Sequence, residues 1–165
     1  MSSEKLGELR AAVAQEMQHM QAAVDAYDEA AAIFLGVNRT DLRCLEILGT
    51  QGPVTPSVLG PALGLTTGSV TAMLDRLEKL GYLTRSPDPS DRRKVVVRIT
   101  EEAAARTWEL YGPIATEGEA VMAEFGAAEL ERVRLFLRRS RELYERHLER
   151  VRAEPAKQGR RGPRG

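Results

Sequence analysis

The sequence is poor in the residues on which metal binding, cross-linking and most catalysis depend. One cysteine and two histidines, His19 and His147, occur in 165 residues. A single cysteine excludes a disulfide within the chain, and two distant histidines form no zinc motif. No glycine-rich phosphate loop follows a strand, and no group is placed to activate a nucleophile. The sequence therefore predicts neither an enzyme nor a bound metal or cofactor.

Long apolar runs are missing too. No segment approaches the roughly 20 apolar residues that a membrane-spanning helix needs, and the N-terminus lacks the apolar core of a signal peptide. We therefore expect a cytoplasmic protein without membrane association. The chain is 42% hydrophobic, which is enough for the core of one ordinary domain.

The chain has no net charge, and this alone argues against a nucleic-acid partner. The distribution of the charges argues for one. Residues 1–36 hold 2 basic and 6 acidic side chains, a net charge of −4, whereas residues 37–100 hold 9 basic and 6 acidic side chains, a net charge of +3. The middle of the chain therefore carries the positive potential that attracts a polyanion.

This middle region predicts two short helices joined by a tight turn. The first begins at Thr55-Pro56, with an N-cap residue before a proline at the first helical position, and ends near Leu63. Gly64 makes the turn, and Thr66 caps a second helix over about residues 67–80. A connection of three or four residues with a glycine is typical of a helix-turn-helix unit.

The second of these helices has two different faces. One face is an apolar stripe at three- and four-residue spacing: Val70, Met73, Leu74, Leu77 and Leu80. The other is polar or small: Thr67, Ser69, Thr71, Ala72, Asp75, Arg76 and Lys79. Small side chains near a helix N-terminus allow close approach to a DNA duplex. An ordinary capped amphipathic helix shows the same pattern, so this helix alone does not decide the function.

A predicted β-hairpin follows directly. Residues 82–86 and 94–99 are strand-like, and the segment between them contains two prolines and cannot continue either strand. Arg92, Arg93 and Lys94 would project from its tip, where guanidinium groups can enter a minor groove and a lysine can contact phosphate. An isolated basic turn is usually only a solvated loop. Attached to a helix-turn-helix, it is interpreted as a wing.

Several sequence runs resemble the multiple antibiotic resistance regulator (MarR) family: Leu63 to Thr71, Leu74 to Leu83, Asp91-Arg92-Arg93 and Ile99-Thr100. The resemblance covers roughly residues 6–150. It implies a dimeric winged-helix transcription factor with Thr67 to Arg76 in a major groove. It also implies that Arg93 reaches a minor groove and that Asp91 orients the neighbouring arginines.

The pattern and the resemblance together give the candidate DNA-binding residues: Thr66, Thr67, Gly68, Ser69, Thr71, Ala72, Arg76, Asp91, Arg92, Arg93 and Lys94. Two positions depart from the family pattern. Pro61 falls inside the first helix of the motif, where proline removes a backbone hydrogen bond. Ala72 stands where many relatives carry a longer polar side chain.

The rest of the chain predicts long helices that need a partner. A helix over about residues 3–35 carries an apolar stripe: Leu6, Leu9, Val13, Met17, Met20, Val24, Tyr27, Ala31 and Phe34. Such a helix would be about 48 Å long at 1.5 Å per residue, which is too long for so small a domain to cover. Thr100 caps a later helix with an expected bend at Gly112-Pro113. Gly126 ends it, and a last helix over about residues 127–152 has two apolar strips.

The predicted fold class is therefore mainly α with a small β-wing. A winged helix-turn-helix lobe over residues 37–100 would bind DNA, and residues 1–36 and 101–152 would form a helical dimerisation lobe. Residues 153–165 are expected to be a disordered tail. A monomeric helical bundle is the alternative to the dimer.

The resemblance further implies a small aromatic or phenolic effector in a cleft between the lobes. Met20, Tyr27, Trp108 and Tyr111 are the candidate lining residues, although ordinary core packing at helical spacing is the favoured explanation for each of them. Cys44 lies in an expected helix over residues 39–48 between apolar residues, where a buried cysteine behaves as a small apolar side chain.

The function predicted from the sequence is a ligand-responsive transcription regulator, and the resemblance implies a repressor. Its homodimer would bind double-stranded DNA at a pseudo-palindromic operator with half-sites roughly 10 base pairs apart. Three alternatives stay open: a winged-helix module that binds protein and not DNA, a regulator that senses oxidants through Cys44, and a small-molecule enzyme on a helical dimer.

Overall fold

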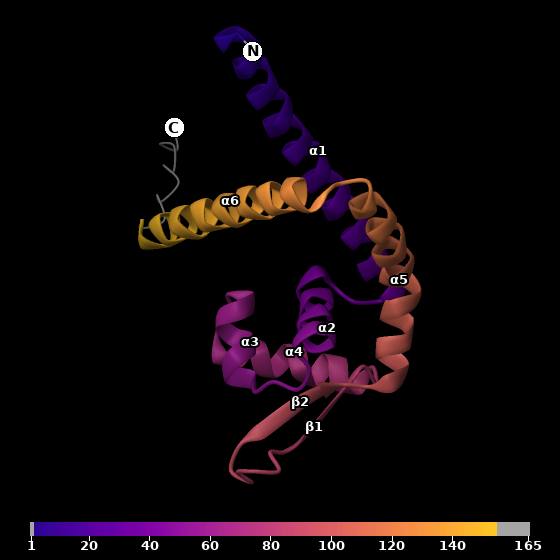
Figure 1. Cartoon of the computed structure of the whole chain (residues 1–165). Helices are drawn as coiled ribbons and strands as arrows, with labels where there is room; N and C mark the ends of the chain where they lie inside the picture. Colours follow the sequence, from indigo (N-terminus) through magenta and orange to yellow (C-terminus); the bar gives the residue numbers. More distant parts are fainter. Residues whose placement is uncertain (1, 155–165) are drawn as a thin grey trace, which may run out of the picture. The chain divides into compact units, whose positions relative to one another are not determined.

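The computed structural model describes residues 2–154 and has eight elements (Figure 1). In chain order they are α1 (Ser3–Leu35), α2 (Arg39–Gln51), α3 (Pro56–Leu63), α4 (Thr67–Lys79), β1 (Leu83–Pro87), β2 (Val95–Ile99), α5 (Glu101–Ala123) and α6 (Ala127–Ala153). The predicted order and type of elements are confirmed. Residues 155–165, most of the predicted tail, lie outside the described residues, and residue 153 belongs to α6.

Short side-chain contacts fix where the helices begin. Ser2, Asn38, Thr66 and Thr100 each accept a hydrogen bond from the backbone N–H three residues later. The predicted caps at Thr66 and Thr100 are thus confirmed. Thr55 occupies the N-cap position of α3, but its hydroxyl bonds to the Ser57 hydroxyl at 2.8 Å and makes no capping bond.

The turn between α3 and α4 closes although Pro61 lies inside α3. Pro61 lacks only one donor, and α3 still reaches Leu63. Gly64 follows with a φ of 67°, in the left-handed region that favours glycine. The Leu65 N–H donates to the Gly60 carbonyl at 2.9 Å, which ends the helix and directs the chain into α4.

The two strands form an antiparallel hairpin. Leu83 pairs with Ile99 and Pro87 with Val95, so that the loop over residues 88–94 forms the tip. The expectation that Pro87 cannot continue the first strand is therefore wrong, because a proline is tolerated at the end of a strand where no further ladder donor is needed. Val54, before α3, bridges to Val97 on β2. The hairpin is thereby attached to the helix-turn-helix along one edge.

A single hydrophobic core joins these elements. Its fully buried apolar side chains come from α2, α3, α4 and both strands: Leu42, Leu45, Leu48, Leu59, Met73, Leu74, Leu77, Leu83 and Val97. Ala31, Ala32 and Leu35 at the end of α1 and Ala103 near the start of α5 belong to the same cluster. The helix-turn-helix and the hairpin are therefore packed against the end of α1 and the start of α5.

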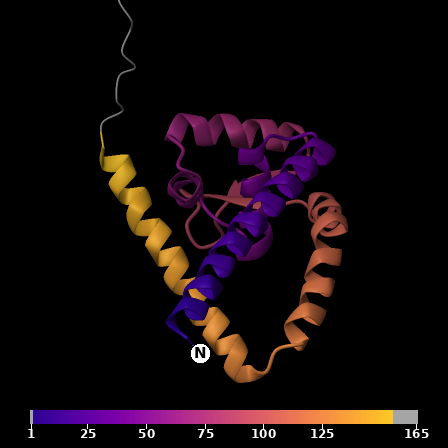
Figure 2. The ribbon, with the colours of Figure 1, turned by 90° about the horizontal axis from the view of Figure 1, so that it is seen from above.

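The described residues divide into two compact units, with the boundary between Pro113 and Ile114. Helix α1 is one continuous 33-residue rod in the first unit (Figure 2). Helix α5 continues through Gly112 and Pro113, where the boundary falls, and ends at Ala123. The expectation that Gly126 ends α5 is wrong, because Gly126 is the N-cap of α6. Its N–H donates to the Glu129 carboxylate at 2.8 Å.

Within residues 2–154, no single helix has the length and apolar composition required to cross a membrane. The bent pair formed by α3 and α4, at 108° to each other, passes that test of length and composition. The apolar side chains Leu59, Val70, Met73, Leu74 and Leu77 of this pair are buried in the core.

Candidate nucleic-acid interface

Helix α4 presents its small residues to solvent. Its apolar side chains Val70, Met73, Leu74 and Leu77 are buried, whereas the N-cap and the outward face of its first half are exposed: Thr66, Thr67, Gly68, Ser69, Thr71 and Ala72. A Cβ added at Gly68 would meet nothing within 4 Å. This face is therefore open to close approach by a large ligand.

Local hydrogen bonds define what the hydroxyls on this face can do. Thr66 Oγ1 accepts from the Ser69 N–H at 3.3 Å and lies 2.9 Å from the Ser69 hydroxyl. The Thr71 hydroxyl donates to the Thr67 carbonyl at 3.1 Å. With its proton used in this way, Thr71 presents lone pairs and a methyl group outward. These groups suit an amino group and a thymine methyl on base edges.

The tip of the hairpin is basic and solvent-exposed. The Arg93 side chain is 93% exposed, and Arg92 and Lys94 are also exposed. Asp91 Oδ1 accepts from the Arg93 N–H at 3.2 Å and from its Nε at 3.4 Å, and Lys94 Nζ lies 3.9 Å from Asp91 Oδ2. Such long surface contacts orient the side chains and leave most of their hydration and charge available.

Asp88 organises this tip, and sequence reasoning missed it. Its Oδ1 accepts from the Ser90 N–H at 2.7 Å, from the Ser90 hydroxyl at 2.6 Å and from the Asp91 N–H at 3.3 Å. These bonds, chiefly that from the Ser90 hydroxyl, lower the pKa of Asp88. The signal in the sequence is an aspartate two residues before a serine in a proline-containing loop, a pattern typical of an Asx-turn.

Arg85 connects the base of the hairpin to α4, and it too was missed. Its Nη1 lies 2.7 Å from Asp75 Oδ1, and its Nε donates to Glu78 Oε2 at 3.0 Å. Hydrogen bonding to Arg85 lowers the pKa of Glu78, and the same bond raises the pKa of Arg85. An ion-pair cluster therefore links the base of the wing to α4.

Arg76, on the polar face of α4, turns toward α2. Its guanidinium makes two hydrogen bonds to the carboxylate of Asp41, at 2.8 and 2.6 Å, and its side chain is 47% exposed. Asp41 is fully buried. Sequence reasoning did not single out Asp41, although it lies on the same helical face as the buried Leu45 and Leu48, where a charged residue needs a partner.

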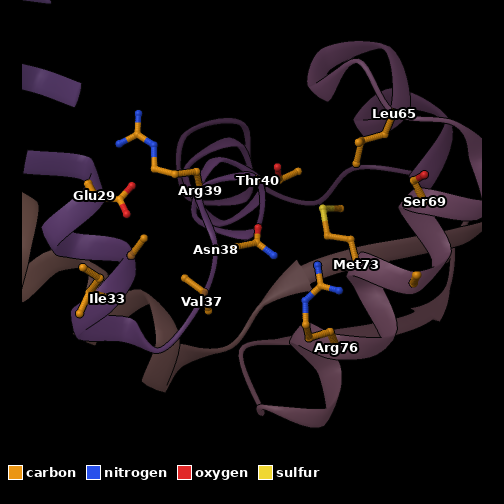
Figure 3. Close-up of a pocket in the computed structure, with 12 residues that line it drawn as sticks. Glu29, Ile33, Val37, Asn38, Arg39, Thr40, Leu65, Ser69, Met73 and Arg76 are labelled. Atoms are coloured by element: carbon orange, nitrogen blue, oxygen red, sulfur yellow. The ribbon is translucent and has the colours of Figure 1, made fainter. Parts of the chain in front are cut away.

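Two cavities adjoin these helices in the first unit. One of about 730 Å³ lies between the end of α1, the start of α2 and α4, and Figure 3 shows Arg76 extending into it from α4. A second cavity, of about 600 Å³, is lined by α1, α2 and the end of α3. In the described part of the chain, Met20, Tyr27, Trp108 and Tyr111 line neither of these two cavities.

The four candidate effector residues fall into two groups. Tyr27 and Tyr111 pack edge to face with ring centroids 5.5 Å apart. The Tyr27 hydroxyl donates to the Leu110 carbonyl at 2.6 Å, and the Tyr111 hydroxyl donates to Asp28 at 3.0 Å. Burial and this bond raise the pKa of Tyr111. Met20 and Trp108 are 56% and 66% exposed. The structure thus joins two of the residues and leaves the other two at the surface.

Cys44 is fully buried in α2. Burial, helped by the charge of Asp41, raises the pKa of its thiol to about 12. Because the thiolate is the reactive form, this environment suppresses reaction with oxidants. Within residues 2–154 there is also no group of three or more His, Cys, Asp or Glu side chains suited to hold a metal ion.

A capped helix with an exposed small-residue face, a tight helix-helix turn and a hairpin with a basic tip define a winged helix-turn-helix protein of the DNA-binding class. A model of the MarR family matches residues 37–95, from just before α2 to the start of β2. The uncharacterized HTH-type transcriptional regulator YcgE of Bacillus subtilis (strain 168) is 39% identical over 125 residues, which cover 76% of this chain and 81% of that relative. The chain belongs to the MarR family and is a DNA-binding transcription regulator.

Solved structures share the fold. The transcriptional regulator Tm0710 from Thermotoga maritima has a TM-score of 0.59 at 23% identity and covers 84% of this chain and 98% of its own. Wild-type MarR in its apo form from E. coli has a TM-score of 0.53 at 23% identity, covering 76% of this chain and 94% of its own. The predicted fold class is confirmed. The family is one of transcription regulators, which is not an enzyme class.

Proposed function

We propose that this regulator is a cytoplasmic homodimeric repressor that covers a pseudo-palindromic operator and responds to a small ligand. The observation that carries the dimer is the exposure of the apolar side chains on α6. Along its described length none of its side chains is buried. The exposed apolar residues of this helix are Val133, Phe136, Leu137, Leu143, Tyr144, Leu148 and Val151.

A second copy of the chain is the occupant that fits these faces. Helix α1 exposes Leu9, Val13, Met20 and Val24 in the same three- and four-residue rhythm. Apolar stripes on helices of 33 and 27 residues are stable in water only when another helix covers them. Residues 1–36 and 101–152 therefore supply the dimer lobe in this proposal, and residues 37–100 bind DNA.

Each protomer would contact one half-site through α4 and the wing. The face over residues 66–72 would enter the major groove, where its hydroxyls and methyl groups contact base edges. Arg92, Arg93 and Lys94 would contact the minor groove and phosphates, with Asp91 holding Arg93 in place. Two-fold symmetry would place the half-sites roughly 10 base pairs apart. A protein that covers promoter DNA in this way represses transcription.

Ligand response is the second part of the proposal. A small aromatic or phenolic effector would contact Met20, Tyr27, Trp108 and Tyr111, which lie on α1 and α5. It would act by binding more tightly to the conformation of the dimer that cannot bind DNA. The exposure of Trp108 supports this placement, because an indole ring that is 66% exposed can stack on an aromatic ligand.

The test combines fragment capture with a measurement of mass. Purified protein is mixed with sheared genomic DNA, and the bound fragments are sequenced. We expect a shared palindrome upstream of a few genes. Sedimentation should give the mass of two chains, both for the free protein and for the protein bound to one operator. Bound fragments without a palindrome, or the mass of one chain at micromolar concentration, would contradict the proposal. An absence of salt-dependent DNA affinity would favour the protein-interaction module.

A further inference from the structure

The guanidinium of Arg76 is held by a carboxylate that solvent hardly reaches. Its Nε donates to Asp41 Oδ2 at 2.8 Å and its Nη2 donates to Oδ1 at 2.6 Å, while the Asp41 side chain is 1% exposed. The backbone N–H of Asp41 donates to Asn38 Oδ1 at 2.9 Å, so this residue sits in the capped first turn of α2. Two parallel bonds between a guanidinium and a carboxylate fix both their separation and their common plane.

Asp41 depends on this arginine. A buried carboxylate without a cation is strongly disfavoured. Among the described residues, the hydrogen bonds that reach the Asp41 side chain come from Arg76. The hydrogen bond to Asp41 raises the pKa of Arg76, so the arginine stays charged.

The first turn of α2 is itself anchored. Arg39, two residues before Asp41, places its Nη2 3.2 Å from Asp25 Oδ1 and its Nη1 3.3 Å from Asp28 Oδ2 on α1. It also donates to the Asp25 carbonyl at 3.1 Å. Asp41 therefore holds Arg76 from a turn that is attached to α1.

Helix α4 has a second ion-pair contact in another direction. Asp75, the neighbour of Arg76, pairs with Arg85 on β1, and Glu78 accepts from the same arginine. Consecutive side chains leave an α-helix about 100° apart. Contacts from Asp75 to the hairpin and from Arg76 to α2 therefore oppose rotation of α4 about its own axis in both senses.

We propose that Asp41 and Arg76 are a positioning pair that sets the rotation of the recognition helix. The pair aims residues 66–72 at the major groove, and Arg76 contributes to operator binding through Asp41 and not through a base or a phosphate. This role replaces the direct contact that the sequence predicts for Arg76. It rests on α4 being the recognition helix.

The two roles of Arg76 differ in what they do to binding. A direct phosphate contact strengthens binding to every DNA sequence and increases its dependence on salt. A positioning pair acts only on the matched contacts between side chains and base edges. It therefore changes the preference for the operator over a random duplex and leaves the salt dependence as it is.

The experiment measures affinity for the captured operator and for a random duplex of equal length, each over a range of salt concentrations. Asp41→Asn keeps the shape of the side chain and removes its charge. Arg76→Lys keeps a charge and removes the two-bond geometry, and Arg76→Ala removes both. Glu46→Gln is the matched control, because Glu46 lies on the same helix and pairs locally with Arg43 at 2.7 Å. Helix content by circular dichroism is recorded for each variant.

We expect Asp41→Asn and Arg76→Lys each to weaken operator binding about tenfold, with random-duplex binding within about twofold of the original. The salt slope should not change, and the double variant should lose less than the sum of the two losses. Glu46→Gln should bind both duplexes normally. The proposal is overturned if Asp41→Asn keeps full operator preference, or if Arg76→Ala weakens both duplexes alike and lowers the salt slope by about one.

A further variant keeps the test sharp if loss of one charge unfolds the chain. Asp41→Leu combined with Arg76→Met replaces the pair by apolar groups, so that no charge is left buried at position 41 without a partner. We expect this double variant to show native helix content and normal random-duplex binding but to lose its preference for the operator. Retained operator preference would refute the positioning role.

Discussion

The hydroxyl of Tyr82 donates a hydrogen bond of 2.7 Å to the carbonyl of Leu35. Tyr82 precedes β1 and Leu35 is the last residue of α1, so one buried side chain joins the base of the wing to the end of a flanking helix. Arg106 on α5 donates to the same hydroxyl at 2.9 Å and lies over the ring, 5.6 Å from its centroid. Three parts of the first unit therefore meet at one tyrosine.

Tyr82→Phe should destabilise the fold by about 1–2 kcal/mol, because the Leu35 carbonyl keeps its burial and loses its partner. The measurement is urea unfolding followed by circular dichroism. Ser57→Ala is the control, since it also removes one hydroxyl and Ser57 is exposed on α3, outside the proposed dimer lobe. Equal midpoints for the two variants would show that the buried hydrogen bond adds nothing to stability.

Arg93→Ala should weaken binding to operator and random DNA by a similar factor and lower the salt slope by about one, because a wing arginine contacts phosphate and the minor groove. Fluorescence anisotropy at several salt concentrations measures both quantities. Lys5→Ala removes the same charge from the exposed start of α1 and should leave binding unchanged. Unaltered operator affinity of Arg93→Ala would exclude the wing from the interface.

Asp88→Ala should loosen the wing tip and weaken DNA binding without changing helix content, because three hydrogen-bond donors lose their acceptor. Ser90→Ala removes one of these donors and should have a smaller effect. Hydrogen exchange of the loop amides reports the loosening, and equal protection in Asp88→Ala and the original protein would contradict this role.

The same turn should respond to acid. Hydrogen bonds lower the pKa of Asp88 in the folded protein. The stabilisation that its carboxylate gives to the turn is therefore complete above the ordinary pKa of 3.8 and is lost as the pH falls through the lowered pKa. The chemical shift of the Ser90 amide should therefore titrate with a midpoint below 3.8. A midpoint at or above that value would show that the bonds do not persist in solution.

Cys44 should resist alkylation in the native protein. Its pKa is raised from 9.0 to about 12, so the thiolate population at pH 8 is about a thousandfold lower than for an exposed cysteine. Because of the same shift, the stability that the fold gains from burying the neutral thiol is complete below pH 9 and is lost as the pH rises toward 12. We expect slow reaction with iodoacetamide in buffer and rapid reaction in concentrated urea. Loss of DNA binding on peroxide treatment would instead support redox sensing.

Local signals in the sequence predict most of the fold. The caps at Thr66 and Thr100 bond to atoms three residues later, so each helix start can be deduced from a short segment. Two strand-like segments flank a proline-containing basic loop, and this pattern predicts the wing, although Pro87 itself still pairs as the last residue of β1. Thr55 is the exception, because a serine two residues later competes for its hydroxyl.

Contacts between distant residues are harder to predict. Asp41 and Arg76 are 35 residues apart, and nothing in either local pattern names the other as a partner. The sequence therefore predicts Arg76 on the DNA side of α4, whereas packing directs its guanidinium to α2. The contact between Tyr27 and Tyr111 likewise depends on how α1 packs against α5, and a single sequence does not reveal that packing.

The lack of burial along α6 has a consequence for gene dosage. If two chains must share this helix to order it, the amount of assembled repressor scales with the square of the number of free chains whenever the protein is scarce. Halving its synthesis would then leave about a quarter of the dimers. A cell could release the operator by slowing production alone, before any ligand appears.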